Sequence, residues 1–126
     1  MATARLFENP AEAPRERRKY PRIRAAIQVE LRREMNDSPL RVVTADISLG
    51  GCYVETMLPL ETGAALNMVL WMDGEKLVTQ GVVVTRHPQF GNGIKFVGMP
   101  STDQQRLARF LAKLQAAEPQ KRVGLI

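Results

Sequence analysis

The chain has 126 residues, of which 44% are hydrophobic and 6% aromatic, and its formal net charge is +5. This length predicts one domain. No segment approaches the run of about 18 apolar residues that a membrane-spanning helix needs. A single cysteine excludes an internal disulfide and is typical of a reducing compartment, so we expect a cytoplasmic protein. Because there is also only one histidine, a zinc site built from His and Cys is excluded, and we expect no metal.

Residues 1–14 contain two prolines and no periodic pattern, which predicts a flexible tail, and they lack the apolar block of a signal peptide. The next ten residues, 15–24, form the basic segment, with six Lys or Arg and one Glu. The basic segment therefore carries +5, equal to the net charge of the whole chain. A charge concentrated in this way attracts anions, above all phosphates.

The basic segment is predicted to be extended. Pro21 disfavours the helical conformation at the preceding residue, Tyr20. In an extended chain, side chains four residues apart face the same side, roughly 13 Å apart. Arg18 and Arg22 would then reach toward one shared object.

Alternation of apolar and polar residues predicts about six short strands after the basic segment. In the second of them we expect Val43, Ala45 and Ile47 to face the core. Trp71 falls on the opposite face from its apolar neighbours, and we expect it to pack under a helix. The expected strands cover residues 26–32, 40–48, 52–56, 66–72, 77–86 and 94–97, with turns at 36–39, 73–74 and 87–93.

Helical spacing replaces alternation after residue 100. A sequence typical of a capping box begins at Ser101, and the apolar residues Leu107, Phe110, Leu111 and Leu114 follow at helical spacing. We expect an amphipathic helix over 101–117, closed by a proline at 119, and a C-terminal tail over 118–126. No crossover helix separates the strands, so the sheet should be antiparallel: a small barrel or sandwich, with the domain spanning 15–117.

The stretch from Asp46 to Gly51, D-I-S-L-G-G, is the second informative motif. Asp46 and Ser48 are two residues apart in a strand, so their acceptor and hydroxyl groups should share the face opposite Ile47. Gly51 would permit a turn with positive φ and close approach of a ligand. A strand end followed by a simple Asx or Ser turn is the alternative interpretation.

Together the two motifs resemble the PilZ domain family. Arg18-x-x-x-Arg22 and Asp46-x-Ser48-x-x-Gly51 match the family pattern RxxxR and [D/N]xSxxG, and the stretch at 93–97 and the Leu-rich helix resemble the family's ending. The resemblance covers about residues 15–114 and implies a six-stranded antiparallel β-barrel with a C-terminal α-helix. It also implies binding of the bacterial second messenger cyclic di-GMP, which carries two phosphodiester charges and two guanines.

The resemblance assigns roles to individual residues. Arg18 and Arg22 would contact phosphate and guanine, because a guanidinium fork matches phosphate oxygens and guanine O6/N7. Asp46 and Ser48 would bind one guanine edge, with Asp46 also able to orient an Arg, and Gly51 would leave room for the base. An Arg at position 17 goes in this family with binding of a stacked ligand dimer, so Arg17 predicts two ligands per site.

The expected function is that of a non-enzymatic, single-domain receptor that changes conformation and signals to a protein partner. His87 and Cys52 lie on different predicted strands and form no nucleophile–base pair, so no catalytic residue is assigned. One alternative is a basic barrel that binds single-stranded nucleic acid, although the barrel itself is nearly neutral and lacks an aromatic platform for bases. The other is a PilZ-like adaptor that binds only protein.

Overall fold

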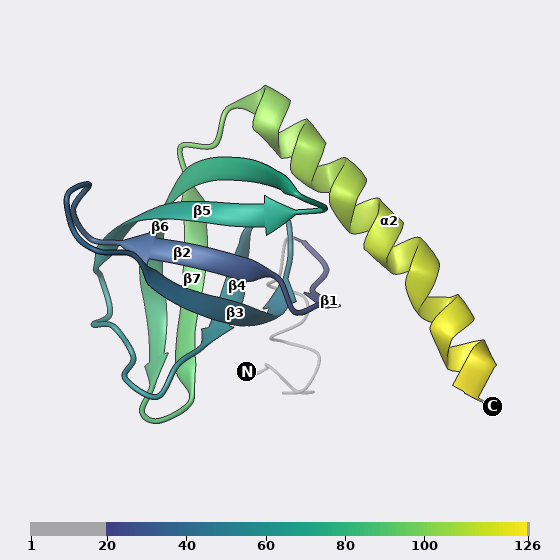
Figure 1. Ribbon diagram of the computed structural model, residues 1–126, viewed down its shortest axis with the longest axis horizontal. Helices are drawn as coiled ribbons and strands as arrows, with labels where there is room; N and C mark the ends of the chain where they lie inside the picture. The colour runs from purple at the N-terminus through teal and green to yellow at the C-terminus, as the bar shows by residue number, and fades with distance from the viewer. Residues whose placement is uncertain (1–19, 126) are drawn as a thin grey trace, which may run out of the picture.

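The computed structural model describes the backbone of residues 20–125 and the side chains of residues 20–117. A twisted barrel of strands stands beside one long helix, whose C-terminal end extends away from the barrel (Figure 1). The elements are β1 (Ile23–Arg24), β2 (Gln28–Arg32), β3 (Leu40–Ile47), β4 (Gly51–Glu55), β5 (Ala65–Met72), β6 (Glu75–His87), β7 (Gly91–Val97) and α2 (Ser101–Leu125).

Six of the strands close into an antiparallel ring, in the order β2-β3-β4-β7-β6-β5, and the two-residue β1 is added at the edge of β3. This confirms the predicted antiparallel barrel with a C-terminal helix. The ring consists of two three-strand meanders, β2-β3-β4 and β5-β6-β7, whose strands follow one another along the chain. The meanders meet at two seams, where β2 pairs with β5 and β4 pairs with β7.

The barrel interior is filled by the residues that the alternation pattern points inward. In β5 the four predicted core residues, 66, 68, 70 and 72, are all at most 4% exposed. Helix α2 adds Leu107, Phe110 and Leu111 to the same apolar cluster, with Leu114 partly buried against it. The predicted apolar face of the helix is therefore confirmed, and its burial holds α2 against the barrel.

Strand β3 departs from simple alternation. Val43 is 40% exposed, whereas Thr44 and Ile47 are buried. The register between β3 and β4 shifts between Thr44 and Asp46, so one extra residue, Ala45, changes which face the following side chains occupy. The prediction that Val43 faces the core is therefore wrong, and the prediction for Ile47 is correct.

Two turns frame β6. Asp73 and Gly74 both have positive φ, 51° and 81°, which is the conformation of a tight hairpin turn and confirms the turn predicted there.

The final strand begins at Gly91, three residues earlier than expected. Asn92 is predicted to lie in a turn but belongs to β7 and is fully buried. Its amide donates to the carbonyls of Leu60 and Thr85, and its Oδ1 accepts from the Leu60 N–H.

Helix α2 begins where predicted but ends later. It starts at Ser101 and continues to Leu125, so the expected end at residue 117 and the C-terminal tail over 118–126 are wrong. Pro119 lacks an N–H and removes one helical hydrogen bond, but its fixed φ is close to the helical value, so the backbone can continue through it.

Candidate functional site

An open pocket of about 480 Å³ lies on the outer surface of the barrel, where the residues just before β1 meet β4, β6 and β7. It spans the β4–β7 seam. It brings together Arg22 of the basic segment and the backbone of the D-I-S-L-G-G stretch, which are about 25 residues apart in sequence. The lining residues are Tyr20, Arg22, Ser48, Gly50, Gly51, Cys52, Tyr53, Val84, Thr85, His87, Gly93, Ile94 and Lys95.

Arg22 and Asp46 join the two sequence motifs directly. The short strand β1 pairs antiparallel with β3, with Arg24 opposite Asp46, and this places Arg22 at the start of the pairing. Its Nη1 lies 3.5 Å from Asp46 Oδ1, and both side chains remain partly exposed, at 43% and 26%. Arg22 lines the pocket, and Asp46 contacts Arg22 from beside the pocket.

Ser48 is 7% exposed and organises the turn before β4. Its Oγ accepts the Gly50 N–H at 3.1 Å and donates to the Gly51 carbonyl at 3.4 Å. The Ser48 N–H also donates to the Gly51 carbonyl, at 2.8 Å. The simple turn interpretation of this stretch therefore applies, and the same turn forms part of the pocket wall.

The structural reason for a glycine at position 51 differs from the expected one. It is the first residue of β4, and its φ is not positive. A Cβ at this position would collide with the backbone carbonyl of Ile94 on β7. Gly51 thus allows β4 and β7 to approach across the seam, and the expectation that it supplies a positive-φ turn is wrong.

Arg17 and Arg18, together with the tail over residues 1–14, lie outside the described residues. The predicted contacts of these two arginines therefore remain predictions. Of the six candidate site residues, the structure places Arg22, Asp46, Ser48 and Gly51 in or beside one pocket.

Several pocket residues were not identified from the sequence: Tyr20, Tyr53, His87 and Lys95. Tyr20 packs over Gly50, whose Cβ, if present, would lie 2.9 Å from Tyr20 Cδ2. Tyr53 meets His87, with the hydroxyl 2.9 Å from Nδ1. A sequence signal for Tyr53 existed, because it follows Gly51 by two residues and so shares its face of β4. The sequence around His87 gives no such signal, because its partner Tyr53 lies on another strand, β4.

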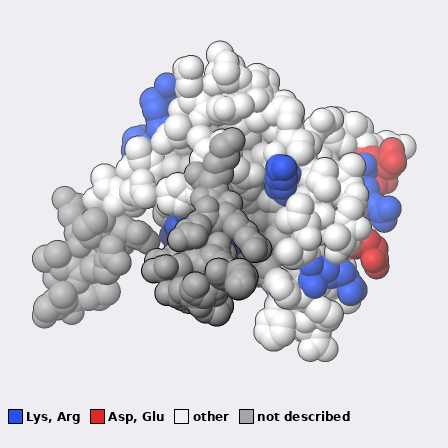
Figure 2. Space-filling model, turned by 180° about the vertical axis from the view of Figure 1, so that it is seen from behind, with Lys and Arg blue, Asp and Glu red and all other residues white. Residues whose placement is uncertain are grey.

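The pocket favours an anion. Arg22 and Lys95 line it, and no carboxylate does so among the residues that the structure describes. Seen from behind, Lys and Arg side chains are spread over the surface in small groups, and Asp and Glu gather toward one edge (Figure 2). The hydroxyls of Ser48 and Thr85, three aromatic rings and two cations surround one open hollow. Such a hollow can bind a molecule with negative charge and planar rings.

Two pocket side chains are neutral at physiological pH. The pKa of the Cys52 thiol is raised from 9.0 to about 12, mainly by burial and also by Asp46, while Arg22 acts in the opposite direction. The pKa of Tyr53 is also raised, first by burial and then by Asp46 and Glu55. Cys52 is buried, as expected of a core residue, so its thiol is a poor nucleophile.

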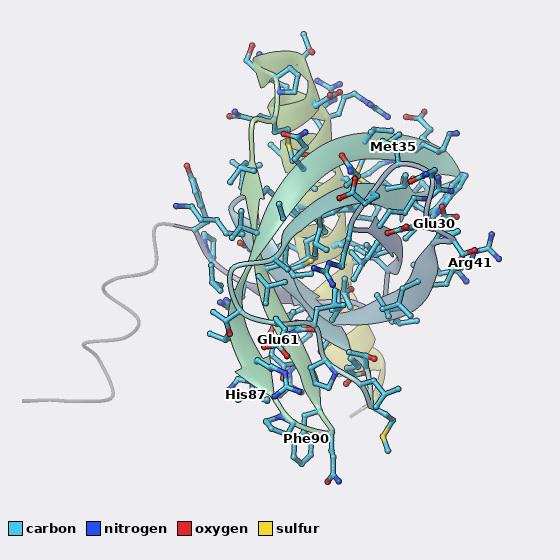
Figure 3. All side chains as sticks on the ribbon, turned by 90° about the vertical axis from the view of Figure 1, so that its left-hand side faces the viewer. Glu30, Met35, Arg41, Glu61, His87 and Phe90 are labelled. Carbon is cyan, nitrogen blue, oxygen red and sulfur yellow. The ribbon has the colours of Figure 1, made fainter. Side chains whose placement is uncertain are left out.

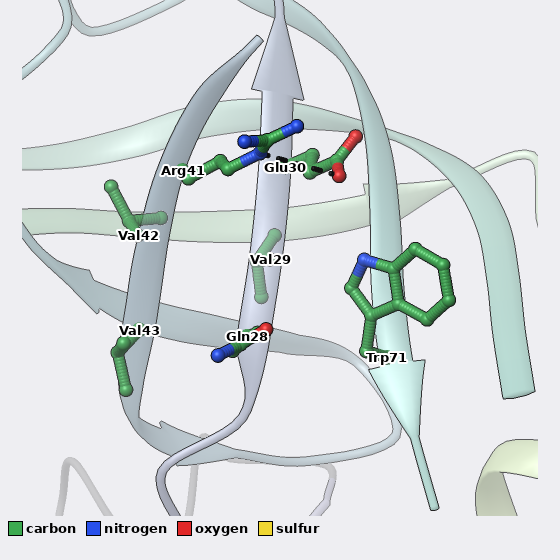
Figure 4. Close-up of a pocket in the computed structure, with 7 residues that line it drawn as sticks. All are labelled: Gln28, Val29, Glu30, Arg41, Val42, Val43 and Trp71. Carbon is green, nitrogen blue, oxygen red and sulfur yellow. Dashed lines mark ion pairs between the residues drawn. The ribbon is translucent and has the colours of Figure 1, made fainter. Parts of the chain in front are cut away.

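A second hollow, of about 350 Å³, lies on the opposite side of the barrel, on the outer face of β2, β3 and β5 (Figure 4). Trp71 lines it, 36% exposed, beside Gln28 and Val43, and Glu30 and Arg41 form an ion pair at 3.6 Å at its edge. Figure 3 shows that Glu30 and Arg41 lie well away from His87. The expected packing of Trp71 under the helix is wrong, because its side chain lines this hollow with residues of β2 and β3.

The described part of the chain contains no cluster of three or more His, Cys, Asp or Glu side chains able to hold a metal ion. Nor is any helix within residues 20–125 both long enough and apolar enough to span a bilayer.

Comparisons with known proteins agree with this fold. A family model described as PilZ domain matches residues 16–113. The Bacillus subtilis inhibitor of motility MotI/DgrA superposes with a TM-score of 0.68 at 23% identity, over 80% of this chain and 52% of that one. The comparison with curated proteins found no match.

Two further solved structures contain c-di-GMP. The PilZ domain of Escherichia coli YcgR with c-di-GMP has a TM-score of 0.71 and 21% identity, covering 84% of this chain and 97% of that one. The MrkH–c-di-GMP complex of K. pneumonia has a TM-score of 0.71 and 24% identity, covering 83% and 54%. The chain thus spans about half the length of MotI/DgrA and MrkH.

Proposed function

The chain belongs to the PilZ domain family, and on that premise we propose that it binds cyclic di-GMP in the pocket at the β4–β7 seam. The observation that carries the proposal is the ion pair between Arg22 and Asp46, which joins the two family motifs beside one hollow. The c-di-GMP complexes of YcgR and MrkH, which share the fold, add support.

The chemistry of the pocket suits this ligand. Arg22 can bind a phosphodiester or the O6/N7 edge of guanine, and Lys95 adds a second positive charge. Guanine N–H groups can donate to the Ser48 hydroxyl in the pocket wall and to the Asp46 carboxylate beside the pocket, which a simple phosphate site would not require. Gly51, which lines the pocket, has no Cβ and so allows β4 and β7 to lie close together there.

We further propose that Arg17 and Arg18 complete the site and that two stacked ligand molecules bind. The ligand-bound surface would then signal to a protein partner in the cytoplasm. In this proposal the chain is a receptor and carries out no catalytic step.

The test is calorimetric titration of the full chain with cyclic di-GMP. We expect saturable binding in the wild type, and Arg22→Ala should weaken it by about tenfold or more, because a charge-assisted contact to the ligand is lost. Arg41→Ala is the matched control, since Arg41 is also exposed and paired with one carboxylate, Glu30, but lies on the opposite side of the barrel. It should bind as the wild type does.

Stoichiometry and a parallel experiment separate the alternatives. Two ligands per chain would support the stacked dimer, and one would contradict it. A gel-shift titration with single-stranded RNA and DNA tests the nucleic-acid alternative. If the folded wild type binds no cyclic di-GMP, the proposed function is wrong, and the protein-only adaptor becomes the better explanation.

A further inference from the structure

Tyr53 and His87 meet across a strand that separates them. Tyr53 is on β4 and His87 is on β6, and β7 lies between, paired with both. The hydroxyl of Tyr53 lies 2.9 Å from His87 Nδ1, and the two rings lie 5.7 Å apart between centroids, inclined at 35°. The PilZ sequence motifs include neither residue.

Two glycines on β7 make this contact possible. Gly93 pairs with Tyr53 on one side and with Thr85 on the other, and Gly91 pairs with Glu55 and with His87. A Cβ at Gly93 would collide with the Thr85 hydroxyl, and a Cβ at Gly91 would lie 3.0 Å from the Tyr53 ring. The middle strand therefore has no side chains there, and the rings of its two neighbours close over it.

The pair forms one end of the same pocket that contains Arg22. The Tyr53 contact occupies Nδ1 of the imidazole and leaves Nε2 as the nitrogen available to a ligand. Tyr53 remains a neutral hydroxyl at physiological pH, because burial, Asp46 and Glu55 raise its pKa. It can therefore donate to a neutral imidazole or accept from a protonated one, and holds the ring in place in both states.

We infer that Tyr53 and His87 are further ligand-binding residues, with His87 contacting a phosphodiester of the bound nucleotide through Nε2 and Tyr53 positioning it. This inference rests on the proposed function. Protonation of the imidazole would add a third positive charge to Arg22 and Lys95, opposite an anionic ligand. Binding of cyclic di-GMP thus takes up protons and tightens as the pH falls.

Charged side chains of both signs lie around the imidazole. Glu55 on β4 lies in the same row of the sheet as His87, and Asp46 lies beside the pocket. Lys95 on β7 and Arg22 line the pocket with His87, and Arg86 precedes it on β6. A phosphodiester bound next to the imidazole adds negative charge there and favours the protonated ring, so proton uptake accompanies binding.

The experiment is calorimetry of the full chain with cyclic di-GMP at about pH 6 and about pH 7.5, where the phosphodiesters stay ionised. Buffers of different ionisation enthalpy report the protons taken up. The wild type should bind roughly three- to tenfold more tightly at the lower pH and take up a fraction of a proton. His87→Gln should show neither effect, and Tyr53→Phe should reduce the pH ratio to less than about twofold. Arg41→Ala is again the control for both effects, and thermal unfolding checks that each variant is folded.

The outcomes separate this inference from the proposed function. If the wild type binds but His87→Gln keeps its affinity, pH ratio and proton uptake, this inference is overturned and the proposed function stands. If the wild type does not bind at either pH, both are overturned.

Discussion

Thr44 and Ile27 are joined by two hydrogen bonds that run in opposite directions. The Thr44 N–H donates to the Ile27 carbonyl at 3.0 Å, and the Ile27 N–H donates to Thr44 Oγ1 at 3.0 Å. The same hydroxyl donates to the Ala25 carbonyl at 2.5 Å. Thr44 is 2% exposed, so from inside the barrel it holds the residues that directly follow the basic segment against β3. This attachment helps to keep Arg22 beside Asp46.

Thr44→Val should destabilise the fold by about 2 kcal/mol, because it leaves the buried Ile27 N–H and the partly buried Ala25 carbonyl without their partner. Urea unfolding measures the change. Thr44→Ser is the control: it retains the hydroxyl and should cost less. A Thr44→Val protein as stable as the wild type would show that these hydrogen bonds contribute little to stability.

Gly51→Ala should destabilise the fold by at least about 2 kcal/mol, since a Cβ there meets the backbone carbonyl of Ile94, which cannot move without opening the seam. Gly50→Ala is the matched comparison, because its Cβ would meet the movable ring of Tyr20 instead. We expect a smaller loss for Gly50→Ala, measured by the same urea titration. A Gly51→Ala protein as stable as the wild type would contradict the close approach of β4 and β7.

Arg106 should anchor the start of α2 to the barrel. Its guanidinium donates to the Lys76 carbonyl at 2.8 Å and to Asp103 and Glu75 at 3.1 and 3.3 Å. Arg106→Ala should cost about 1 kcal/mol in urea unfolding, because several bonds to a charged group are lost together. Lys113→Ala removes a single exposed pair with Asp73 at 3.6 Å and should cost less than about 0.5 kcal/mol. The reverse order would argue against the anchor.

Cys52 should resist alkylation while the protein is folded. Its thiol is buried and its pKa is raised to about 12, so little thiolate forms near neutral pH. We expect alkylation about 100-fold or more slower than in urea, measured by mass spectrometry. Rapid labelling of the native protein would contradict this burial.

The raised pKa of Cys52 also affects stability at high pH. The thiol ionises near pH 9.0 in the unfolded chain, and only at higher pH in the folded protein. The contribution of the buried neutral thiol to the free energy of unfolding is therefore complete below pH 9.0 and is lost as the pH rises toward 12.

Much of the fold could be predicted because the alternation of apolar and polar residues along a strand indicates which side chains are buried. The four core positions of β5 and the apolar face of α2 follow from periodicity alone. Val43 was misplaced because a β-bulge at Ala45 changes the phase, and nothing in the local sequence marks it. The predicted helix is too short because a proline commonly ends a helix, whereas α2 continues through Pro119.

The site was predictable where residues near in sequence carry it. Ser48 and Gly51 fall in one turn, and Asp46 precedes it, so one motif identifies all three. The contact between Tyr53 and His87 depends on the register of three strands and on the two glycines between them. Such a contact is a property of the sheet and is not encoded in any short segment.

The division of the barrel into two meanders has a kinetic consequence. Each meander consists of pairings between consecutive strands, whereas the β4–β7 seam joins residues some forty positions apart, so loop-closure entropy makes it form later. A molecule bound in the pocket touches β4 on one side of this seam and β6 and β7 on the other. It would slow the opening of the seam, and amide hydrogens of Tyr53 and Gly93 would exchange with solvent more slowly as occupancy rises.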